Sequence, residues 1–287
     1  MSKQKDQQRQ FTRELVINAP KEAVWKALSD AVEVCQWFAP EAVISGPVGG
    51  EVRWKWTNEI VWQQTITTWD VGERLVTTYD SEVDNGIGGK VPLFMDFQLQ
   101  SNRDGSTTTL RLIHSGFGPE ADFDSEYDGI SHGWFIELRS LQLYLEKHLG
   151  QQRQLCWIQA EFGMGSDEAW QRLTGSNGLN CAAGLLNLQT GDRFNFTTAD
   201  GDFFTGEVYK NTPHSFVGIV ENWDYSFLRI EVETCSSTNQ LWLWHATYGQ
   251  DQNKVDAITY RWQTMVDRLF GKQSVNQSQS ALQQVNL

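Results

Sequence analysis

Two stretches of the chain share one spacing of apolar residues, and this repetition constrains the fold more than any other feature. The first stretch, Ser131–Glu146, has its apolar positions at Trp134, Leu138, Leu141 and Leu145. These positions recur at the 3.6-residue period of an amphipathic helix. A weaker copy near the C-terminus has its apolar positions at Trp262, Val266, Leu269 and Phe270. The chain is therefore expected to contain two related units, each closed by a long helix.

Four further pairs of segments match in the same order along the two halves of the chain. They are residues 23–30 with 168–175, 49–56 with 190–197, 93–100 with 227–234, and 109–118 with 240–249. A duplication explains this order best. Independent convergence on a common alternating pattern stays open as the alternative. The expected domains are residues 11–150 and 153–271, with residues 1–10 and 272–287 as flexible tails.

The order of patterns within each half predicts a fold of mixed helices and antiparallel strands. Each half is interpreted as a strand, a pair of helices, a long meander of strands and a C-terminal helix. In the segment 51–57, Val52, Trp54 and Trp56 alternate with Arg53 and Lys55, as in a strand with one buried face. Residues 116–129 are expected to form an acidic loop before the first long helix. The predicted class is α+β.

Composition narrows the possible partners and the compartment. The formal net charge of −13 disfavours nucleic acid and anionic membrane surfaces. No apolar run approaches the length of a membrane span, so no membrane insertion is expected. The four cysteines form no CxxC pair, which indicates thiols in a reducing compartment. With no apolar run in the first ten residues, a cytoplasmic location is expected.

Several motifs of the first half resemble those of the START/SRPBCC superfamily, and most closely those of its heat-shock protein ATPase activator homologues. They are APKEAVWKALSD, WFAP, GGEVRW, LRLIHSGFG and HGWFIELRSLQLYLE. The resemblance covers Phe11 to Gly150 well and Leu155 to Gly271 weakly. The second half departs where Tyr260, Arg261 and Trp262 replace the His-Gly-Trp triplet. It is interpreted as a degenerate copy.

The resemblance implies the helix-grip fold, in which a curved antiparallel sheet wraps around a long C-terminal helix. It also implies a cavity between sheet and helix. Many members bind hydrophobic small molecules, some eukaryotic members are co-chaperones of the stress response, and a minority are enzymes. The expected function is binding of an apolar or aromatic small molecule without catalysis. The alternatives are a co-chaperone-type protein interaction module, and a cyclase or lyase that uses His114.

The residues expected to contact the ligand come from the inward faces of the first unit. They are Trp37, Trp54, Trp56, Met95, Phe97, Leu112, His114, Trp134 and Leu138. His114 and His245 occupy matched positions, each on a face with two leucines. Each is either a polar group that meets a ligand or a buried histidine satisfied by the fold. Buried polar groups are more often of the second kind.

No metal or other cofactor is expected. The cysteines and histidines lack zinc-site spacing. Acidic residues alternate from Glu120 to Asp128, but a calcium loop beginning at Asp122 would need glycine and glutamate where Tyr127 and Gly133 stand. The expected partners are an apolar small molecule and, in the co-chaperone alternative, a chaperone. The expected state is a monomer or a homodimer.

Overall fold

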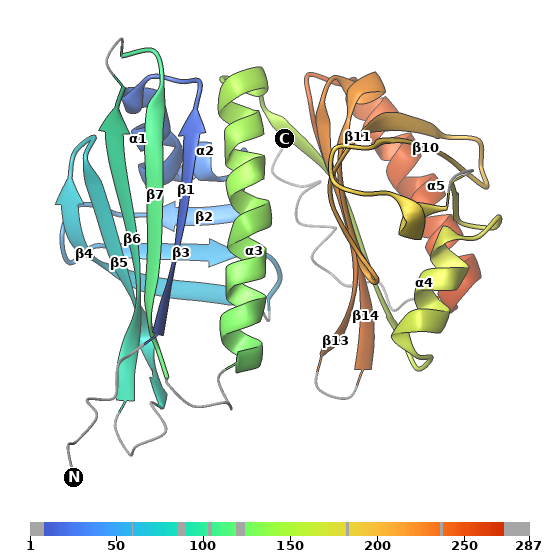
Figure 1. Cartoon of the computed structure of the whole chain (residues 1–287), viewed down its shortest axis with the longest axis horizontal. Coiled ribbons are helices and arrows are strands. Elements are labelled where there is room, and N and C mark those ends of the chain that lie inside the picture. Colours follow the sequence, from blue (N-terminus) through green and yellow to red (C-terminus); the bar gives the residue numbers. More distant parts are fainter. Residues whose placement is uncertain are drawn as a thin grey trace. The chain divides into compact units, whose positions relative to one another are not determined.

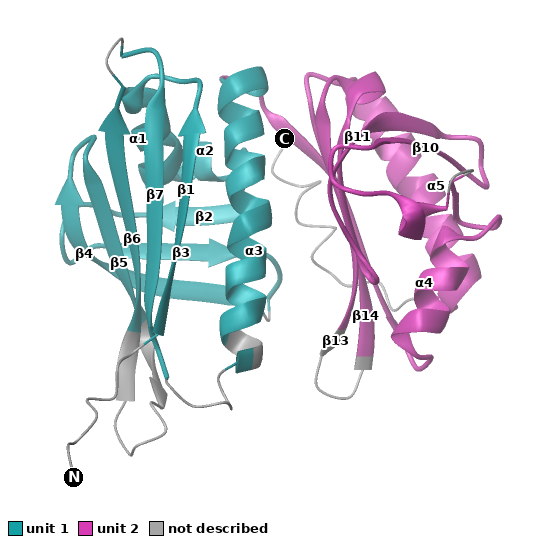
Figure 2. Ribbon diagram, in the orientation of Figure 1, with its two compact units in different colours: residues 1–149 teal, residues 150–287 magenta. Residues whose placement is uncertain are grey.

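The computed structural model describes residues 9–58, 60–84, 90–102, 105–118, 124–181, 184–235 and 238–272. It consists of two compact units, Met1–Leu149 and Gly150–Leu287 (Figures 1 and 2). The predicted flexible tails lie almost wholly outside the described residues, as do Glu120 and Asp122 of the acidic segment.

The first unit contains one seven-stranded antiparallel sheet in the order β1-β7-β6-β5-β4-β3-β2. Its strands are β1 (Arg9–Ile17), β2 (Glu41–Ile44), β3 (Glu51–Lys55), β4 (Val61–Asp70), β5 (Arg74–Asp84), β6 (Lys90–Ser101) and β7 (Thr108–Phe117). Its helices are α1 (Lys21–Ser29), α2 (Ala31–Val34) and α3 (Asp124–Leu143), and α3 continues into a π-helical turn, η2 (Tyr144–His148).

Local sequence explains where the two short helices begin. Pro20 lies at the N-cap of α1. A backbone N–H at the start of a helix has no partner within the helix, so proline loses no hydrogen bond there. The Asp30 carboxylate accepts hydrogen bonds from the backbone N–H groups of Val32 and Glu33, so it caps α2. Together these caps produce the predicted helix pair between β1 and β2.

Helix α3 is longer than the sequence indicates, because it begins at Asp124 rather than near Asp128 or Ser131. The expectation of an acidic loop through Gly129 is therefore wrong for the part after Asp124. Arg9 of β1 forms an ion pair with Asp124, and Tyr127 packs edge-on against Phe11 at 5.8 Å between ring centroids. Such tertiary contacts offset the weak helix propensity of the segment.

The second unit repeats the sheet order as β8-β14-β13-β12-β11-β10-β9. Its strands are β8 (Arg153–Phe162), β9 (Leu179–Asn180), β10 (Arg193–Thr198), β11 (Phe203–Thr212), β12 (Ser215–Val220), β13 (Ser226–Cys235) and β14 (Thr238–Tyr248). Its helices are α4 (Ser166–Thr174) and α5 (Gln252–Phe270), with short 3-10 turns η3 (Leu185–Asn187) and η4 (Glu221–Trp223). The shared order confirms the predicted α+β class with two helix-grip domains.

The expected helix pair of the second unit is wrong for the described residues, where α4 is the only α-helix between β8 and β10. Gly175 and Gly178 follow α4, and a Cβ at Gly178 would lie 2.0 Å from the carbonyl oxygen of Leu173. The chain therefore turns tightly against the end of α4. It continues into β9 and η3 instead of a second helix.

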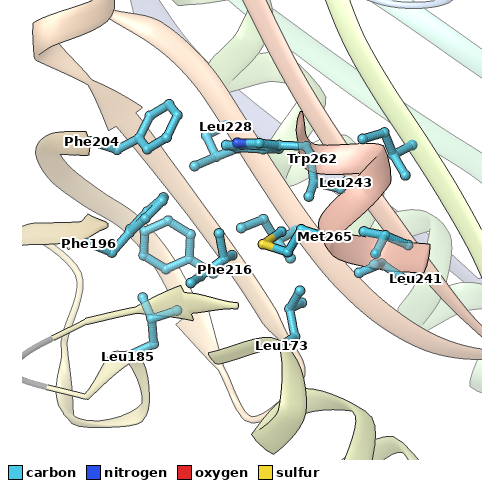
Figure 3. Packing of buried hydrophobic residues seen from close by; sticks show 14 of the residues in the cluster. Leu173, Leu185, Phe196, Phe204, Phe216, Leu228, Leu241, Leu243, Trp262 and Met265 are labelled. Carbon is cyan, nitrogen blue, oxygen red and sulfur yellow. The ribbon is translucent and has the colours of Figure 1, made fainter. Parts of the chain in front are cut away.

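The interior of the second unit is filled by phenylalanine side chains. The ring of Phe196 stacks on Phe194 at 5.6 Å and on Phe204 at 5.0 Å, and Phe216 meets Phe194 edge-on at 5.2 Å. Figure 3 shows Phe196, Phe204 and Phe216 gathered with residues of α5 in one hydrophobic cluster. These ring contacts lie within the buried hydrophobic cluster of the second unit.

Candidate functional site

Aromatic side chains from β3, α3 and the segment after α2 meet in the first unit. Phe38 lies at the centre, with ring centroids 4.9 Å from Trp54, 5.0 Å from Trp56 and 5.3 Å from Trp134. Phe97 of β6 reaches Trp134 edge-on at 5.6 Å. Four of the predicted ligand-contacting residues therefore lie in one cluster, together with Phe38.

The cluster continues along the inner face of the sheet toward His114. Trp62 of β4 is directly opposite Trp54 of β3 and lies 6.1 Å from Tyr79 of β5. Tyr79 in turn lies 5.9 Å from the imidazole of His114, and its hydroxyl is 3.9 Å from Met95 Sδ. One continuous aromatic surface thus joins the Trp134 end of the site to His114.

The remaining predicted residues occupy different places. Leu112 and Leu138 are buried in the core of the unit. Trp37 is also buried, but its indole N–H donates to the carbonyl oxygen of Ala27 in α1 at 2.8 Å, and Phe38 is its ring neighbour. We therefore place Phe38, rather than Trp37, at the centre of the candidate site.

Sequence reasoning missed three aromatic members of this surface: Phe38, Trp62 and Tyr79. Phe38 lies in the WFAP motif next to Trp37, and the sequence gives no signal as to which of the two aromatic residues contacts a ligand. Trp62 could have been found by pairing the segment after Trp56 back onto β3, which sets Trp62 against Trp54. Tyr79 carried no signal of its own in the sequence.

His114 is fully buried inside this aromatic surface. Its ring stacks on Phe11 at 5.4 Å with planes 4° apart, and Phe117 lies 4.9 Å away. Both ring nitrogens are buried, and neither has a hydrogen-bond partner in the described part of the chain. Burial lowers the pKa of His114 to about 3, because the charged imidazolium would lose its hydration. The imidazole is therefore neutral near pH 7.

The matched histidine of the second unit has a partner. His245 Nε2 lies 2.7 Å from the hydroxyl oxygen of Ser226, and the ring stacks on Trp262 at 5.9 Å. Burial, followed by the charge of Lys254, lowers the pKa of His245 to about 3. The fold therefore pairs one ring nitrogen of His245, whereas its Nδ1 is buried without a partner among the described residues.

The strand register explains why His114 lacks this partner. Met95 is paired with His114, and Leu228 is paired with His245. By strand register Met95 therefore corresponds to Leu228. The sequence match of 93–100 with 227–234 is off by one residue from this correspondence. Ser226 precedes Leu228 by two residues, and the equivalent position before Met95 is Leu93. The first unit therefore has an aliphatic side chain where the second has a hydroxyl.

A second buried polar group of the first unit also has no counterpart in the second. Gln64 is buried, its Oε1 accepts a hydrogen bond from the Thr77 hydroxyl, and its Nε2 has no partner among the described residues. The register matches Gln64 and Thr77 with Gly206 and Gly218. The two units thus differ at these matched inner positions. The first unit has polar side chains there, and the second has glycines that lie against phenylalanine rings.

Other buried N–H groups do not distinguish the units. The indole N–H groups of Trp54 and Trp134 have no partner in the described residues, but the same holds for Trp170 and Trp262 in the second unit. The difference between the units therefore rests on His114, Gln64 and their surroundings.

The described residues include no group of three or more side chains placed to hold a metal ion. Cys35, Cys156 and Cys181 form no disulfide. Among the helices that the structure describes, none is both long and apolar enough to cross a membrane. What the site offers chemically is a large aromatic surface with a neutral imidazole and a carboxamide N–H inside it.

Residues 18–146 of the first unit match the model of the family described as "Activator of Hsp90 ATPase homolog 1-like protein". The match lies within one unit and covers less than half of the chain. No curated protein matches the chain in sequence. The family match and the two helix-grip units confirm the resemblance to the START/SRPBCC superfamily.

Several solved structures are similar to the chain at low identity. The Aha1 dimer from Colwellia psychrerythraea is 20% identical, with 50% of this chain and 99% of that chain covered, at a TM-score of 0.42. DynU16, from the dynemicin biosynthetic locus, is 18% identical over 88% of this chain and 93% of that chain, at a TM-score of 0.40. The di-domain ARO/CYC BexL, from the BE-7585A biosynthetic pathway, is 11% identical over 91% and 95%, at a TM-score of 0.39.

Proposed function

The first unit of this chain matches the activator of Hsp90 ATPase homologue family. We propose that the protein binds an apolar or aromatic small molecule within this first unit. The ligand lies against the aromatic surface of Trp54, Trp62, Tyr79 and Trp134 and hydrogen-bonds to His114. The observation that carries the proposal is the buried imidazole of His114, whose two ring nitrogens have no partner in the described residues.

The energetic argument concerns the cost of leaving such a group unpaired. A buried donor or acceptor without a partner destabilises a protein by about 1–3 kcal/mol. In the second unit the hydroxyl of Ser226 removes this cost for Nε2 of His245, although Nδ1 has no partner among the described residues. In the first unit Leu93 cannot do so, and a ligand with a hydroxyl or carbonyl group would. Buried polar groups that the fold leaves unsatisfied in an aromatic surface are typical of binding sites.

The pKa of His114 favours binding over the cyclase or lyase alternative. A general base works best when its pKa lies near the working pH. Burial holds the pKa of His114 at about 3, so its neutral imidazole is a weak base at pH 7. The same neutral ring donates one hydrogen bond and accepts another, which suits it to hold a ligand.

The second unit serves as a scaffold in this proposal. Its matched histidine has one ring nitrogen paired by Ser226, and its interior contains the buried rings of Phe194, Phe196, Phe204 and Phe216. A cytoplasmic location belongs to the same proposal, supported by described cysteines that form no disulfide.

A pair of matched tryptophan variants tests the binding site. The probe is N-phenyl-1-naphthylamine, a neutral aromatic dye whose fluorescence rises in apolar surroundings. Trp134→Leu is expected to weaken dye binding by about fivefold or more through lost aromatic contact. Trp262→Leu, at the matched helix position of the second unit, is expected to leave dye binding unchanged. Unchanged binding in a folded Trp134→Leu protein, or loss in Trp262→Leu alone, would place the site elsewhere.

Native mass spectrometry of the gently purified protein identifies the natural ligand. A small molecule that co-purifies with the wild type and is lost from the Trp134→Leu protein would support the proposal. A molecule retained equally by the Trp134→Leu and wild-type proteins would contradict it.

A co-chaperone role is the second candidate, favoured by the description of the family that residues 18–146 match. The test is the ATP hydrolysis rate of purified Hsp90 with and without equimolar protein. A rate that rises on addition supports this role, whereas an unchanged rate with no complex in size-exclusion chromatography rejects it.

A further inference from the structure

Arg13 of β1 carries a charge that no carboxylate of the described residues neutralises. We propose that the ligand of the first unit is an anion: an aromatic or apolar body with an acidic oxygen group, such as a carboxylate, that pairs with Arg13. The inference rests on the small-molecule binding proposed above, and it adds the charge class of the ligand.

The strand register places Arg13 on the same face of the sheet as His114. Phe11 is paired with His114, and Arg13, two residues later, is paired with Leu112. Directly opposed residues of an antiparallel pair lie on one face. The guanidinium carbon of Arg13 lies 5.5 Å from the ring centroid of Phe11, and Phe11 stacks on His114. The charge therefore adjoins the aromatic surface of the candidate site.

The hydrogen bonds of Arg13 leave its charge unpaired. One terminal nitrogen donates to the hydroxyl of Ser131 in α3 at 2.6 Å and approaches the Ser131 carbonyl oxygen at 3.5 Å. The Nε of Arg13 is buried and has no partner among the described residues. Other arginines differ: Arg74 forms two hydrogen bonds of 2.9 Å with the Asp96 carboxylate, and Arg261 also pairs with Asp202 through two nitrogens.

The matched position of the second unit shows that the fold does not need this charge. Ile158 is paired with Leu243 as Arg13 is paired with Leu112, and its side chain is fully buried. An aliphatic residue therefore suits the inner face of the same edge strand. Arg13 belongs to what distinguishes the first unit, together with His114 and Gln64.

Physical chemistry links the unpaired guanidinium to an anion. A partly buried charge is costly unless it is paired, and contact of a cation with a phenylalanine ring offsets only a small part of that cost. A guanidinium presents its N–H groups in a fork that matches two oxygens of a carboxylate or similar group. The competing explanation is that Arg13 only fastens α3 to β1 through Ser131.

Two dyes with the same aromatic skeleton separate these explanations. 8-Anilinonaphthalene-1-sulfonate is anionic, and N-phenyl-1-naphthylamine lacks the sulfonate. Arg13→Met is expected to weaken sulfonate binding by about tenfold, the size of one charge-assisted hydrogen bond. Binding of the neutral dye is expected to change by less than about twofold, because its contacts are aromatic. The control is Arg111→Met, which removes an exposed arginine from the outer face of neighbouring β7 and should leave both affinities unchanged.

Ser131→Ala tests the fastening explanation, because it removes the contact with α3 and keeps the charge. The preference for the sulfonate is expected to persist in this variant. A loss of preference in Ser131→Ala, an equal loss of both dyes in Arg13→Met, or no loss in Arg13→Met would overturn the inference. If Trp134→Leu still weakens the neutral dye in that case, the proposed binding function stands without its anionic ligand.

Discussion

His245 Nε2 and the hydroxyl oxygen of Ser226 lie 2.7 Å apart in the second unit, and the equivalent hydroxyl is missing beside His114 in the first. The matched histidines thus differ at one ring nitrogen: the fold pairs Nε2 of His245, and among the described residues neither nitrogen of the buried His114 is paired. The difference comes from one neighbouring position, Ser226 against Leu93. It gives the His245 ring a hydrogen bond within the fold that the His114 ring lacks among the described residues.

Replacing each histidine by leucine should have unequal effects on stability. His245→Leu leaves the buried hydroxyl of Ser226 without its partner, so a loss of about 1–3 kcal/mol is expected. His114→Leu removes a buried group that had no described partner, so the ligand-free variant is expected to be as stable as the wild type or more stable, by up to about 1–3 kcal/mol. Thermal unfolding of the ligand-free variants, followed by circular dichroism, measures both. Equal destabilisation by the two substitutions would show that the folded first unit already satisfies His114.

The pKa values of the two histidines predict a loss of stability in mild acid. Their folded-state pKa of about 3 lies below the unfolded value of 6.5, so the unfolded chain binds more protons between these values. Stability is therefore complete above pH 6.5 and falls as the pH drops toward 3. From pH 7.5 to 5 each histidine accounts for about 2 kcal/mol.

The leucine variants isolate this contribution from that of the carboxylates. The stability of His114→Leu relative to wild type should rise by about 2 kcal/mol as the pH is lowered from 7.5 to 5. Urea unfolding midpoints at each pH give the comparison. A difference between variant and wild type that stays constant with pH would mean that His114 titrates normally in the folded protein.

Gly218→Ala should destabilise the second unit. A Cβ at Gly218 would lie 2.8 Å from the ring of Phe194 and 2.9 Å from that of Phe216, and these buried rings cannot move aside freely. Overpacking of this kind costs about 1–3 kcal/mol. Gly163→Ala in the same unit is the control, since nothing lies within 4 Å of its added Cβ. Equal melting temperatures for the two variants would contradict the tight packing over Gly218.

Gly133→Ala should stabilise the first unit. Gly133 lies inside α3, and a Cβ there would have no neighbour within 4 Å. Alanine in a helix interior is favoured over glycine by about 1 kcal/mol. The expected rise of a few degrees in melting temperature is measured by differential scanning calorimetry. A decrease would show that Gly133 has a role beyond helix geometry.

Removal of metal ions should leave the protein unchanged. The described residues form no cluster of metal-ligating side chains. Dialysis against a chelator is expected to shift neither the melting temperature nor the affinity for N-phenyl-1-naphthylamine. A stoichiometric metal in the purified protein, together with a lower melting temperature after chelation, would contradict this expectation.

Patterns along the chain were enough to predict the fold class and the tandem arrangement. Periodicities of 3.6 and 2 residues report which face of a helix or strand is buried, and this information is local. The period of Trp134, Leu138 and Leu141 predicted the long helix α3, although contacts with Arg9 and Phe11 moved its start to Asp124. The inner positions Trp54 and Phe97 were readable from alternation in the same way.

The character of the candidate site was decided by the tertiary structure. Whether a buried histidine is satisfied depends on which residue stands beside it on the neighbouring strand, and pairing far along the chain sets this. The same holds for Arg13, whose place beside Phe11 and the start of α3 follows from strand register. The sequence by itself determined two related α+β units with aromatic inner faces, and the family resemblance implied the helix-grip fold. Only the tertiary structure decided that the fold pairs one ring nitrogen of His245 and, among the described residues, neither nitrogen of His114, because strand register is a long-range property of the chain.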